Sequence, residues 1–212
     1  NPTRSGRTVL LEGFTNVSCL GCPEFAITVE NLMQNEGYGL DRVLFIRYSM
    51  SWPNNMDPHF MYNTPENNDR MSYYMSDLVG GIPQINLDGI GADGSGSNGT
   101  PSLNELSTHI DAALLNTPNF VINVAPDFGN ETIPVEITIS AYQDVTLAGK
   151  TLKVCLVQTL IEYDQAPGSQ GETEFYNIFR DMADSVPPLV NLSAGESQTI
   201  STSLLNGGFD LD

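Results

Sequence analysis

Positive charge is scarce in this chain of 212 residues. Eight lysines and arginines stand against 26 aspartates and glutamates, which gives a formal net charge of −18. Nucleic acids and anionic membrane surfaces repel such a protein, so the composition disfavours both as partners. Long apolar runs are also missing, and no stretch approaches the length that a membrane-spanning helix needs. We therefore expect neither nucleic-acid binding nor a direct membrane span.

Histidine and cysteine are too few for most metal sites. The chain has two histidines, His59 and His109, and three cysteines, of which Cys155 stands far from the other two. A zinc site built on Cys19 and Cys22 needs a second pair of ligands, and the sequence offers no such pair. We therefore expect no zinc site.

A Gly- and Ser-rich stretch offers oxygen ligands but no calcium motif. Asp88, Asp93 and Asn98 lie in or beside residues 91–101. They lack the alternate-residue spacing and the closing Glu of a calcium loop, so we interpret the stretch as a plain connector. Phosphate-binding loops, Ser-His-Asp sets and paired-carboxylate clefts are also missing from the pattern. The sequence thus predicts no metal, no cofactor, and neither hydrolase nor nucleotide chemistry.

The chain does contain a Cys-x-x-Cys pair, Cys19 and Cys22, at a predicted turn from strand to helix. Residues 8–11 have the pattern of a buried strand, and from Pro23 on the apolar residues recur at helical spacing. The dipole and N–H groups of a helix N-terminus favour a thiolate, which is the attacking species in disulfide exchange. On this interpretation Cys19, nearer the loop surface, is the nucleophile and Cys22 is the more buried resolving thiol. A static disulfide that staples the turn is the alternative.

The periodicity changes at Thr117-Pro118. Before this point apolar strands alternate with amphipathic helices, which is typical of an α/β layer fold. After it only strands are indicated, such as the apolar residues 151–163. We therefore predict an α/β domain over residues 1–117 and a small antiparallel β-sandwich over residues 118–212. Cys155, inside the apolar strand, is expected to be a buried and inert thiol.

The Cys-x-x-Cys segment and Ile82-Pro83 resemble the thioredoxin superfamily, in which a cis-proline faces the redox disulfide. A narrower resemblance, to the bacterial twenty-eight-kilodalton outer-membrane-protein family, covers most of the chain. The similar segments are 10–15, 19–23, 56–60, 69–74, 81–89, 152–163 and 174–182. This resemblance implies a thioredoxin-like first domain, an Ig-like sandwich after it, and a location in the periplasm, at the outer membrane or outside the cell.

The resemblance also implies roles for single residues. Pro83 is expected in the cis form against the disulfide. Glu12 takes the place of the buried acid that assists proton transfer to the resolving thiol, with a structural or edge-facing Glu as the alternative. Ser18 departs from the pattern, because thioredoxins carry a tryptophan there. His59 beside Asp57 is interpreted as a solvated loop histidine, with a base or a weak metal ligand as the alternative.

Two classes of function are compatible with these residues. One is an exported thiol–disulfide oxidoreductase that uses the cysteine pair and a cis-proline. The other is a non-catalytic surface or assembly subunit with a structural disulfide. The family's closing strand has no counterpart before Asp212, so we expect a strand from another chain, or from downstream sequence, to complete the β-domain. A protein partner or a neighbouring subunit is therefore expected.

Four aromatic residues are expected in the core and not in a groove: Trp52, Tyr62, Tyr73 and Tyr74.

Overall fold

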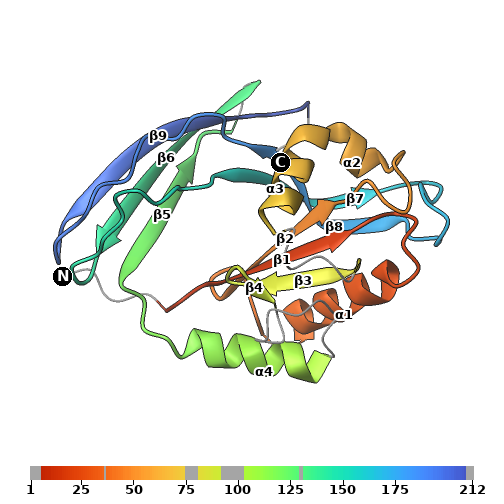
Figure 1. The fold of residues 1–212 in the computed structure, drawn as a ribbon, viewed down its shortest axis with the longest axis horizontal. Helices are drawn as coiled ribbons and strands as arrows, with labels where there is room; N and C mark the ends of the chain where they lie inside the picture. The colour runs from red at the N-terminus through yellow and green to blue at the C-terminus, as the bar shows by residue number, and fades with distance from the viewer. Residues whose placement is uncertain (1–5, 36, 75–80, 92–102, 129–130, 209–212) are drawn as a thin grey trace. The chain divides into compact units, whose positions relative to one another are not determined.

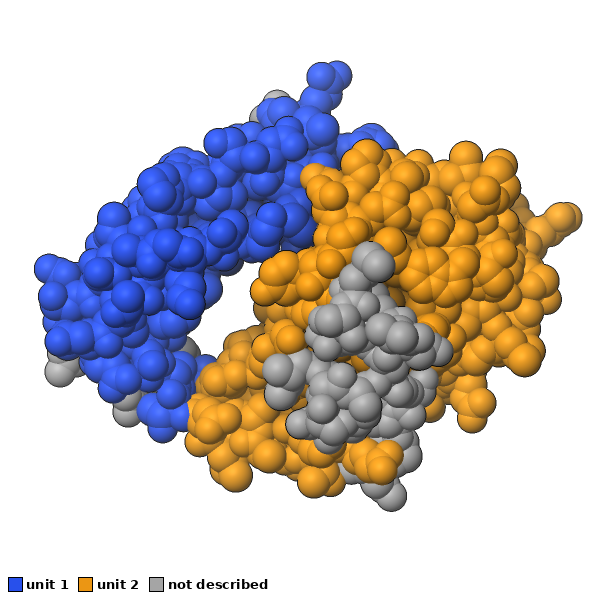
Figure 2. All heavy atoms as spheres, viewed as in Figure 1, with its two compact units in different colours: residues 1–6, 117–156, 181–212 blue, residues 7–116, 157–180 orange. Residues whose placement is uncertain are grey.

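The computed structural model describes residues 6–35, 37–74, 81–91, 103–128 and 131–208. Contacts divide the chain into two compact units, which Figure 2 shows in different colours. The N-terminal unit holds residues 7–116 and 157–180. The β unit is formed mainly by residues 117–156 and by the chain from Asp181 on.

A mixed sheet is the centre of the N-terminal unit. Its strand order is β4-β3-β1-β2-β8-β7 (Figure 1). The strands are β1 (Val9–Thr15), β2 (Val43–Ser49), β3 (Gln84–Leu87), β4 (Ile90–Gly91), β7 (Cys155–Glu162) and β8 (Glu174–Met182). β1 pairs with β2 in parallel and with β3 antiparallel, and β8 joins β2 in parallel at Arg47 and Ile178. The prediction of a mixed α/β layer at the start of the chain is confirmed.

Helices cover both faces of this sheet. They are α1 (Cys22–Asn35), α2 (Pro58–Tyr62), α3 (Thr64–Tyr73) and α4 (Leu103–Leu114). In Figure 1, α1 and α4 lie on one side of the sheet, with α2 and α3 on the other. One apolar core joins α1 and α4 to alternate residues of β1 and β2, among them Val9, Leu11, Val43 and Phe45. Because side chains alternate along a strand, Leu10, Glu12 and Phe14 point to the face that α3 covers.

The β unit contains a three-stranded antiparallel sheet. Its order is β5-β6-β9, with β5 (Phe120–Pro126), β6 (Thr132–Ala141) and β9 (Ser197–Leu205). One face of β6 is apolar and buried, as the alternation along this strand predicts. In the described chain, this face is covered by irregular segments and not by a second sheet. The covering side chains include Val145, Leu147, Leu152, Leu189 and Leu192.

The course of β7 and β8 differs from the predicted division of the chain. The change at Thr117 agrees with the contacts, but residues 157–180 return to the N-terminal unit instead of building a sandwich. Ile178 and Phe175 of β8 pack with Val17, which follows β1, in a separate apolar cluster. Periodicity shows that a segment is a strand, but it does not show which sheet the strand joins. The described β unit is therefore an open sheet with an irregular cover.

Candidate functional site

Cys19 and Cys22 form a disulfide with a Cα–Cα distance of 5.4 Å. The bond closes the turn between β1 and α1, where the Cys22 N–H donates to the Cys19 carbonyl at 3.2 Å. Both cysteines are buried, with 3% and 0% of their surface exposed, so the predicted difference in depth between them is small. Leu20, between them, is 86% exposed and marks the open side of the turn.

Pro83 lies against this turn. The Ile82–Pro83 peptide bond is cis, as predicted. A Cβ atom added at Gly21 would lie 3.3 Å from Cδ of Pro83, so the absence of a side chain at Gly21 permits the close approach. The disulfide turn and Pro83, which directly precedes β3, therefore lie next to each other at one end of the sheet.

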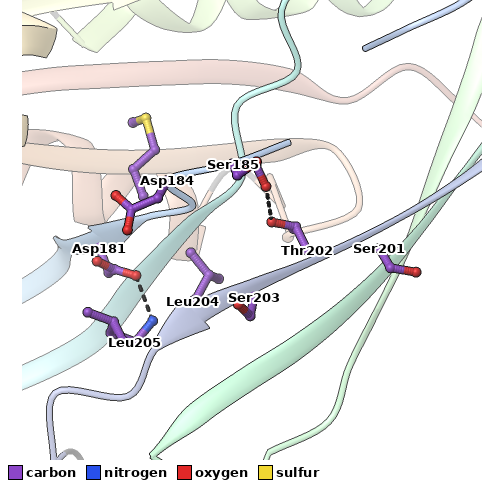
Figure 3. Close-up of a pocket in the computed structure, with 9 residues that line it drawn as sticks. Asp181, Asp184, Ser185, Ser201, Thr202, Ser203, Leu204 and Leu205 are labelled. Atoms are coloured by element: carbon purple, nitrogen blue, oxygen red, sulfur yellow. Dashed lines mark hydrogen bonds between the residues drawn. The ribbon is translucent and has the colours of Figure 1, made fainter. Parts of the chain in front are cut away.

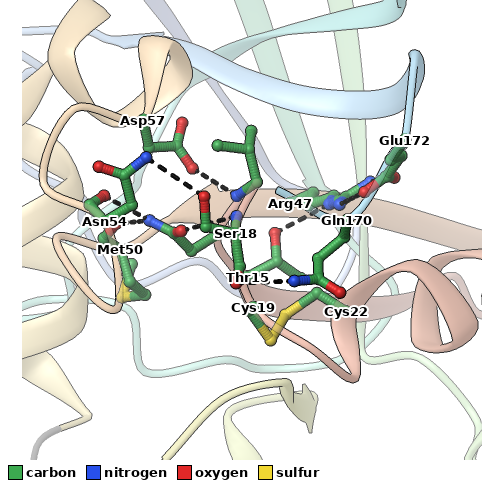
Figure 4. Close-up of a disulfide and its surroundings, with 12 residues drawn as sticks. Thr15, Ser18, Cys19, Cys22, Arg47, Met50, Asn54, Asp57, Gln170 and Glu172 are labelled. Atoms are coloured by element: carbon green, nitrogen blue, oxygen red, sulfur yellow. Dashed lines mark hydrogen bonds and ion pairs between the residues drawn. A yellow bond between two sulfur atoms is a disulfide. The ribbon is translucent and has the colours of Figure 1, made fainter. Parts of the chain in front are cut away.

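The turn before Cys19 is fixed by polar side chains (Figure 4). The Asn16 amide donates to the carbonyls of Met50 and Asn54, each at 2.8 Å, and its Oδ1 accepts from the Ser18 N–H at 2.9 Å. The Cys19 N–H in turn donates to the Asn16 carbonyl at 3.0 Å. Asn16 thus holds the backbone that leads into the disulfide.

Asp57 holds the same turn from another direction. Its carboxylate accepts the Val17 N–H at 2.8 Å and caps α2 by accepting the N–H groups of His59 and Phe60. Burial raises the pKa of this carboxyl above its usual value, against the effect of these three hydrogen bonds. The Asp57 carboxylate therefore has a structural role, because its oxygens accept hydrogen bonds from three backbone N–H groups.

The loop between β7 and β8 closes on the turn from the other side. A Cβ added at Gly168 would lie 2.0 Å from the Val17 carbonyl oxygen, so only glycine fits there. The Ser169 N–H reaches Ser18 Oγ at 3.4 Å, and the Gln170 amide reaches the Ser18 carbonyl at 3.5 Å. Sequence patterns did not predict this loop. No local pattern signals a contact between residues that are 151 positions apart.

A buried arginine ties the loop to the sheet. Arg47 donates to both carboxylate oxygens of Glu172, at 2.9 and 3.1 Å, and through Nε to Thr15 Oγ1 at 2.8 Å. Its side chain is 2% exposed and that of Glu172 is 10% exposed. Such a fork-to-fork pair fixes geometry as well as charge. Thr15 ends β1, so this pair positions the chain immediately before the disulfide turn.

Glu12 is buried in a second charged cluster. Its two carboxylate oxygens accept from Arg70 Nε at 2.7 Å and Arg70 Nη2 at 2.8 Å, and one of them also accepts from the Tyr74 hydroxyl at 2.6 Å. Burial, with the bond to Glu12, raises the pKa of the Tyr74 hydroxyl, which stays a proton donor. Glu12 therefore has partners on the α3 face of the sheet, whereas α1, which begins at Cys22, packs on the opposite face.

His59 is buried, in contrast to the predicted solvated loop position. It is 2% exposed and its ring contacts those of Phe175 and Tyr163, with centroids 4.7 and 5.7 Å away. Neither ring nitrogen has a hydrogen-bond partner within the described ranges. Burial, and then the nearby Arg180 and Arg47, lower the pKa of His59 to about 3. His59 is therefore a neutral core residue at ordinary pH.

This burial predicts a pH effect on stability. The unfolded chain protonates His59 below pH 6.5, but the folded protein does so only near pH 3. The free energy of unfolding therefore falls as the pH drops from 6.5 towards 3. When the pH is lowered from 7 to 4.5, His59→Leu should therefore lose about 2.5 kcal/mol less stability than the parent, at about 1.4 kcal/mol per pKa unit. Urea unfolding at both pH values measures this difference.

The parent protein is the reference for this measurement. Asp57, whose raised pKa gives a slope of opposite sign, is present in both proteins and cancels in the comparison. Parallel loss of stability in the parent and the variant would contradict the burial of a neutral His59.

The remaining sequence candidates do not gather at the disulfide. Asp88, in the turn after β3, accepts the Leu10 N–H at 3.0 Å and pairs with Arg7. Asp93 and Asn98 lie outside the described residues. Cys155 takes no part in the disulfide and is half-buried, not fully buried as predicted. Across the described ranges, no three His, Cys, Asp or Glu side chains come together as a metal ion would require.

The four aromatic candidates are divided between core and surface. Tyr74 is 3% exposed, as predicted for the core, and Trp52 is half-buried. Tyr73 and Tyr62 are 72% and 42% exposed and stack on the guanidinium groups of Arg70 and Arg180, respectively. Each therefore covers an arginine, and no shared groove is formed.

The comparisons with known proteins agree with the fold and do not identify a family. No family model matches the chain, and no curated protein sequence matches it. The structure is similar to that of HBP35 of Porphyromonas gingivalis, with a TM-score of 0.71 and 16% sequence identity. The match covers 97% of this chain and 66% of that chain, so this chain spans less than two thirds of its length. At this identity the likeness shows a shared fold.

None of the helices in the described part is both long and apolar enough to cross a bilayer.

Proposed function

We propose that the chain is an exported, thioredoxin-like thiol–disulfide oxidoreductase with Cys19 as nucleophile and Cys22 as resolving thiol. The observation that carries this is the disulfide at the first residue of α1, with Pro83 in contact with the intervening Gly21. The helix N-terminus lowers the pKa of a thiol placed there, and so makes a thiolate available for exchange. A closed disulfide also suits an oxidising space outside the cytoplasm.

The exchange needs no cofactor. In the reduced protein the Cys19 thiolate attacks a disulfide of the substrate, forms a mixed disulfide and releases one substrate thiolate. The Cys22 thiolate then attacks Cys19 Sγ and releases the second substrate thiol, which leaves the Cys19–Cys22 disulfide. An external dithiol returns the pair to the reduced state. Exposed Leu20 and the edge at Pro83 offer the surface where a substrate meets the turn.

The second candidate is a non-catalytic surface or assembly subunit with a structural disulfide. The burial of both cysteines favours it, as do the contacts of Asn16, Asp57 and Gln170 that hold the turn. For both candidates we propose that Glu12 anchors α3 and is not the proton acceptor, since Arg70 donates to both of its carboxylate oxygens.

The reduction potential of the Cys19–Cys22 pair distinguishes the two candidates. We expect a value between about −120 and −270 mV, the range of working thiol–disulfide pairs. Equilibration with glutathione or dithiothreitol buffers, followed by thiol trapping and mass spectrometry, measures it. Cys155→Ser serves as the background protein, so that two thiols alone are counted. A potential below about −300 mV would overturn the proposal in favour of a structural bond.

A further inference from the structure

One edge of the three-stranded sheet is open at Ser201 and Ser203 of β9. β9 is the last strand in the order β5-β6-β9. At the two ends of its pairing with β6, the Asn206 N–H donates to Glu131 and the Ala141 N–H to the Glu196 carbonyl. In an antiparallel pair such bonds recur at every second residue, so the even-numbered residues of β9 face β6. The backbone N–H and C=O groups of Ser201, Ser203 and Leu205 therefore point away from the sheet.

The direction of Leu205 confirms this alternation. Its N–H donates to the Asp181 carboxylate at 2.7 Å, on the side away from β6. In the described chain, nothing forms a hydrogen bond with the backbone of Ser201 or Ser203 outside their own sheet. In the first half of the strand, the Gln198 side chain accepts the Val190 N–H and donates to the Pro188 carbonyl. Beside Asp181, which holds the Leu205 N–H, the outward backbone groups that stay open among the described residues are those of Ser201 and Ser203.

A cavity of about 390 Å³ lies along this open edge. Figure 3 shows Ser201, Ser203 and Leu205 on β9, with Asp181, Asp184 and Ser185 on the facing segment. Thr202 Oγ1 donates to the Ser185 carbonyl at 2.7 Å and closes the cavity at one point. The groove therefore offers backbone donors and acceptors on one wall and two carboxylates on the other.

The other edge of the sheet, formed by β5, ends in a proline. The Asp127 N–H donates to Pro134, and the Tyr142 N–H donates to Asn119, so the even-numbered residues of β5 point outward. One of them is Pro126, which has no N–H to offer and blunts the edge. Pro126 therefore weakens the β5 edge at one end as a place for a further strand, whereas β9 contains no proline.

We propose that the β9 edge at Ser201 and Ser203 binds an extended, lysine- or arginine-rich segment of another protein, which joins the sheet as a further strand. Main-chain hydrogen bonds to Ser201 and Ser203 supply the pairing, as in β-strand addition generally. The carboxylates of Asp181 and Asp184, in a chain of net charge −18, select a cationic segment. A second copy of this chain carries the same acidic groups and is the less complementary occupant.

Peptide binding to the intact chain tests this proposal. The probe is a fluorescein-labelled heptapeptide, Lys-Val-Lys-Val-Thr-Val-Lys, and its control carries Glu at the three Lys positions. We expect the Lys peptide to raise fluorescence anisotropy on binding and the Glu peptide to leave it unchanged. Affinity should fall at least threefold between 50 and 500 mM NaCl, because the attraction between exposed charges is screened.

Ser203→Pro removes one outward N–H without touching the bonds to β6. We expect a tenfold or greater loss of affinity for the Lys peptide. Val124→Pro, at an outward position of β5, is the matched control and should bind as the parent does. Far-ultraviolet circular dichroism and melting temperature confirm that both variants fold.

Asp184→Asn tests the charge without altering the edge. It should lower the affinity for the Lys peptide about threefold at low salt, whereas Asp127→Asn, beside β5, should leave this affinity unchanged. Equal weakening by Ser203→Pro and Val124→Pro, equal binding of both peptides, or no binding would overturn the proposal. So would a dimer in sedimentation that Ser203→Pro dissolves, because a second copy would then occupy the edge. None of these results depends on the disulfide chemistry.

Discussion

Cys19→Ser should abolish turnover of a disulfide substrate. The exchange requires a thiolate at this position, and a serine hydroxyl does not supply one. Reduction of insulin by dithiothreitol, followed as turbidity, measures the activity. We expect the variant to fall to the rate of dithiothreitol alone.

Cys22→Ser should behave differently, because it removes only the resolving thiol. Cys19 can still attack, so a mixed disulfide with the substrate should accumulate and be visible by mass spectrometry without reductant. Cys155→Ser is the matched control and should keep full activity, since Cys155 takes no part in the disulfide. The bond is structural if neither Cys19→Ser nor Cys22→Ser changes turnover and each of these two variants loses about 2 kcal/mol of stability.

The sequence was sufficient to predict the disulfide because its signals are local. Cys19 and Cys22 are three positions apart at a strand-to-helix turn, and any chain that folds this turn brings them within bonding distance. The same holds for the apolar alternation of β6 and the helical spacing in α1. Each of these features depends on residues within one or two elements.

The surroundings of the disulfide could not be predicted, because they come from distant segments. Gly168 and Gln170 reach the turn only after β7 and β8 have returned to the first sheet. His59, beside Asp57, was predicted in a solvated loop, but Tyr163 and Phe175 bury it. Contacts of this kind are decided by which sheet a strand joins, and strand periodicity does not carry that information.

Sequence patterns could not predict the partner of Glu12 either. The resemblance indicated a buried acid, and the structure does bury Glu12, with 1% of its surface exposed. Arg70, on α3, lies 58 positions away and meets it only because α3 packs on that face of β1. Tyr73 and Tyr74 then stack on the guanidinium, with its Cζ 4.9 and 4.8 Å from the ring centroids. The hydrogen bonds from Arg70 and Tyr74 offset the free-energy cost of burying the Glu12 carboxylate.

Glu12→Ala should lower the free energy of unfolding by about 3–5 kcal/mol. The change leaves the Arg70 guanidinium without its carboxylate in a largely buried site, and breaking a buried pair by removing one partner has this cost. Urea unfolding measures the loss. Arg7→Met provides a matched control, because it breaks the partly exposed pair with Asp88 and should cost about 0–1 kcal/mol.

A double variant separates the structural role of Glu12 from a catalytic one. Glu12→Leu combined with Arg70→Met replaces the whole pair by apolar groups, and we expect it to recover most of the stability lost in Glu12→Ala. If Glu12 only anchors α3 to β1, this double variant should reduce insulin at close to the parental rate. Its rate should also keep the parental pH profile, since no proton acceptor has been removed. A stable double variant with a shifted profile and a tenfold lower rate would instead make Glu12 part of the proton transfer to Cys22.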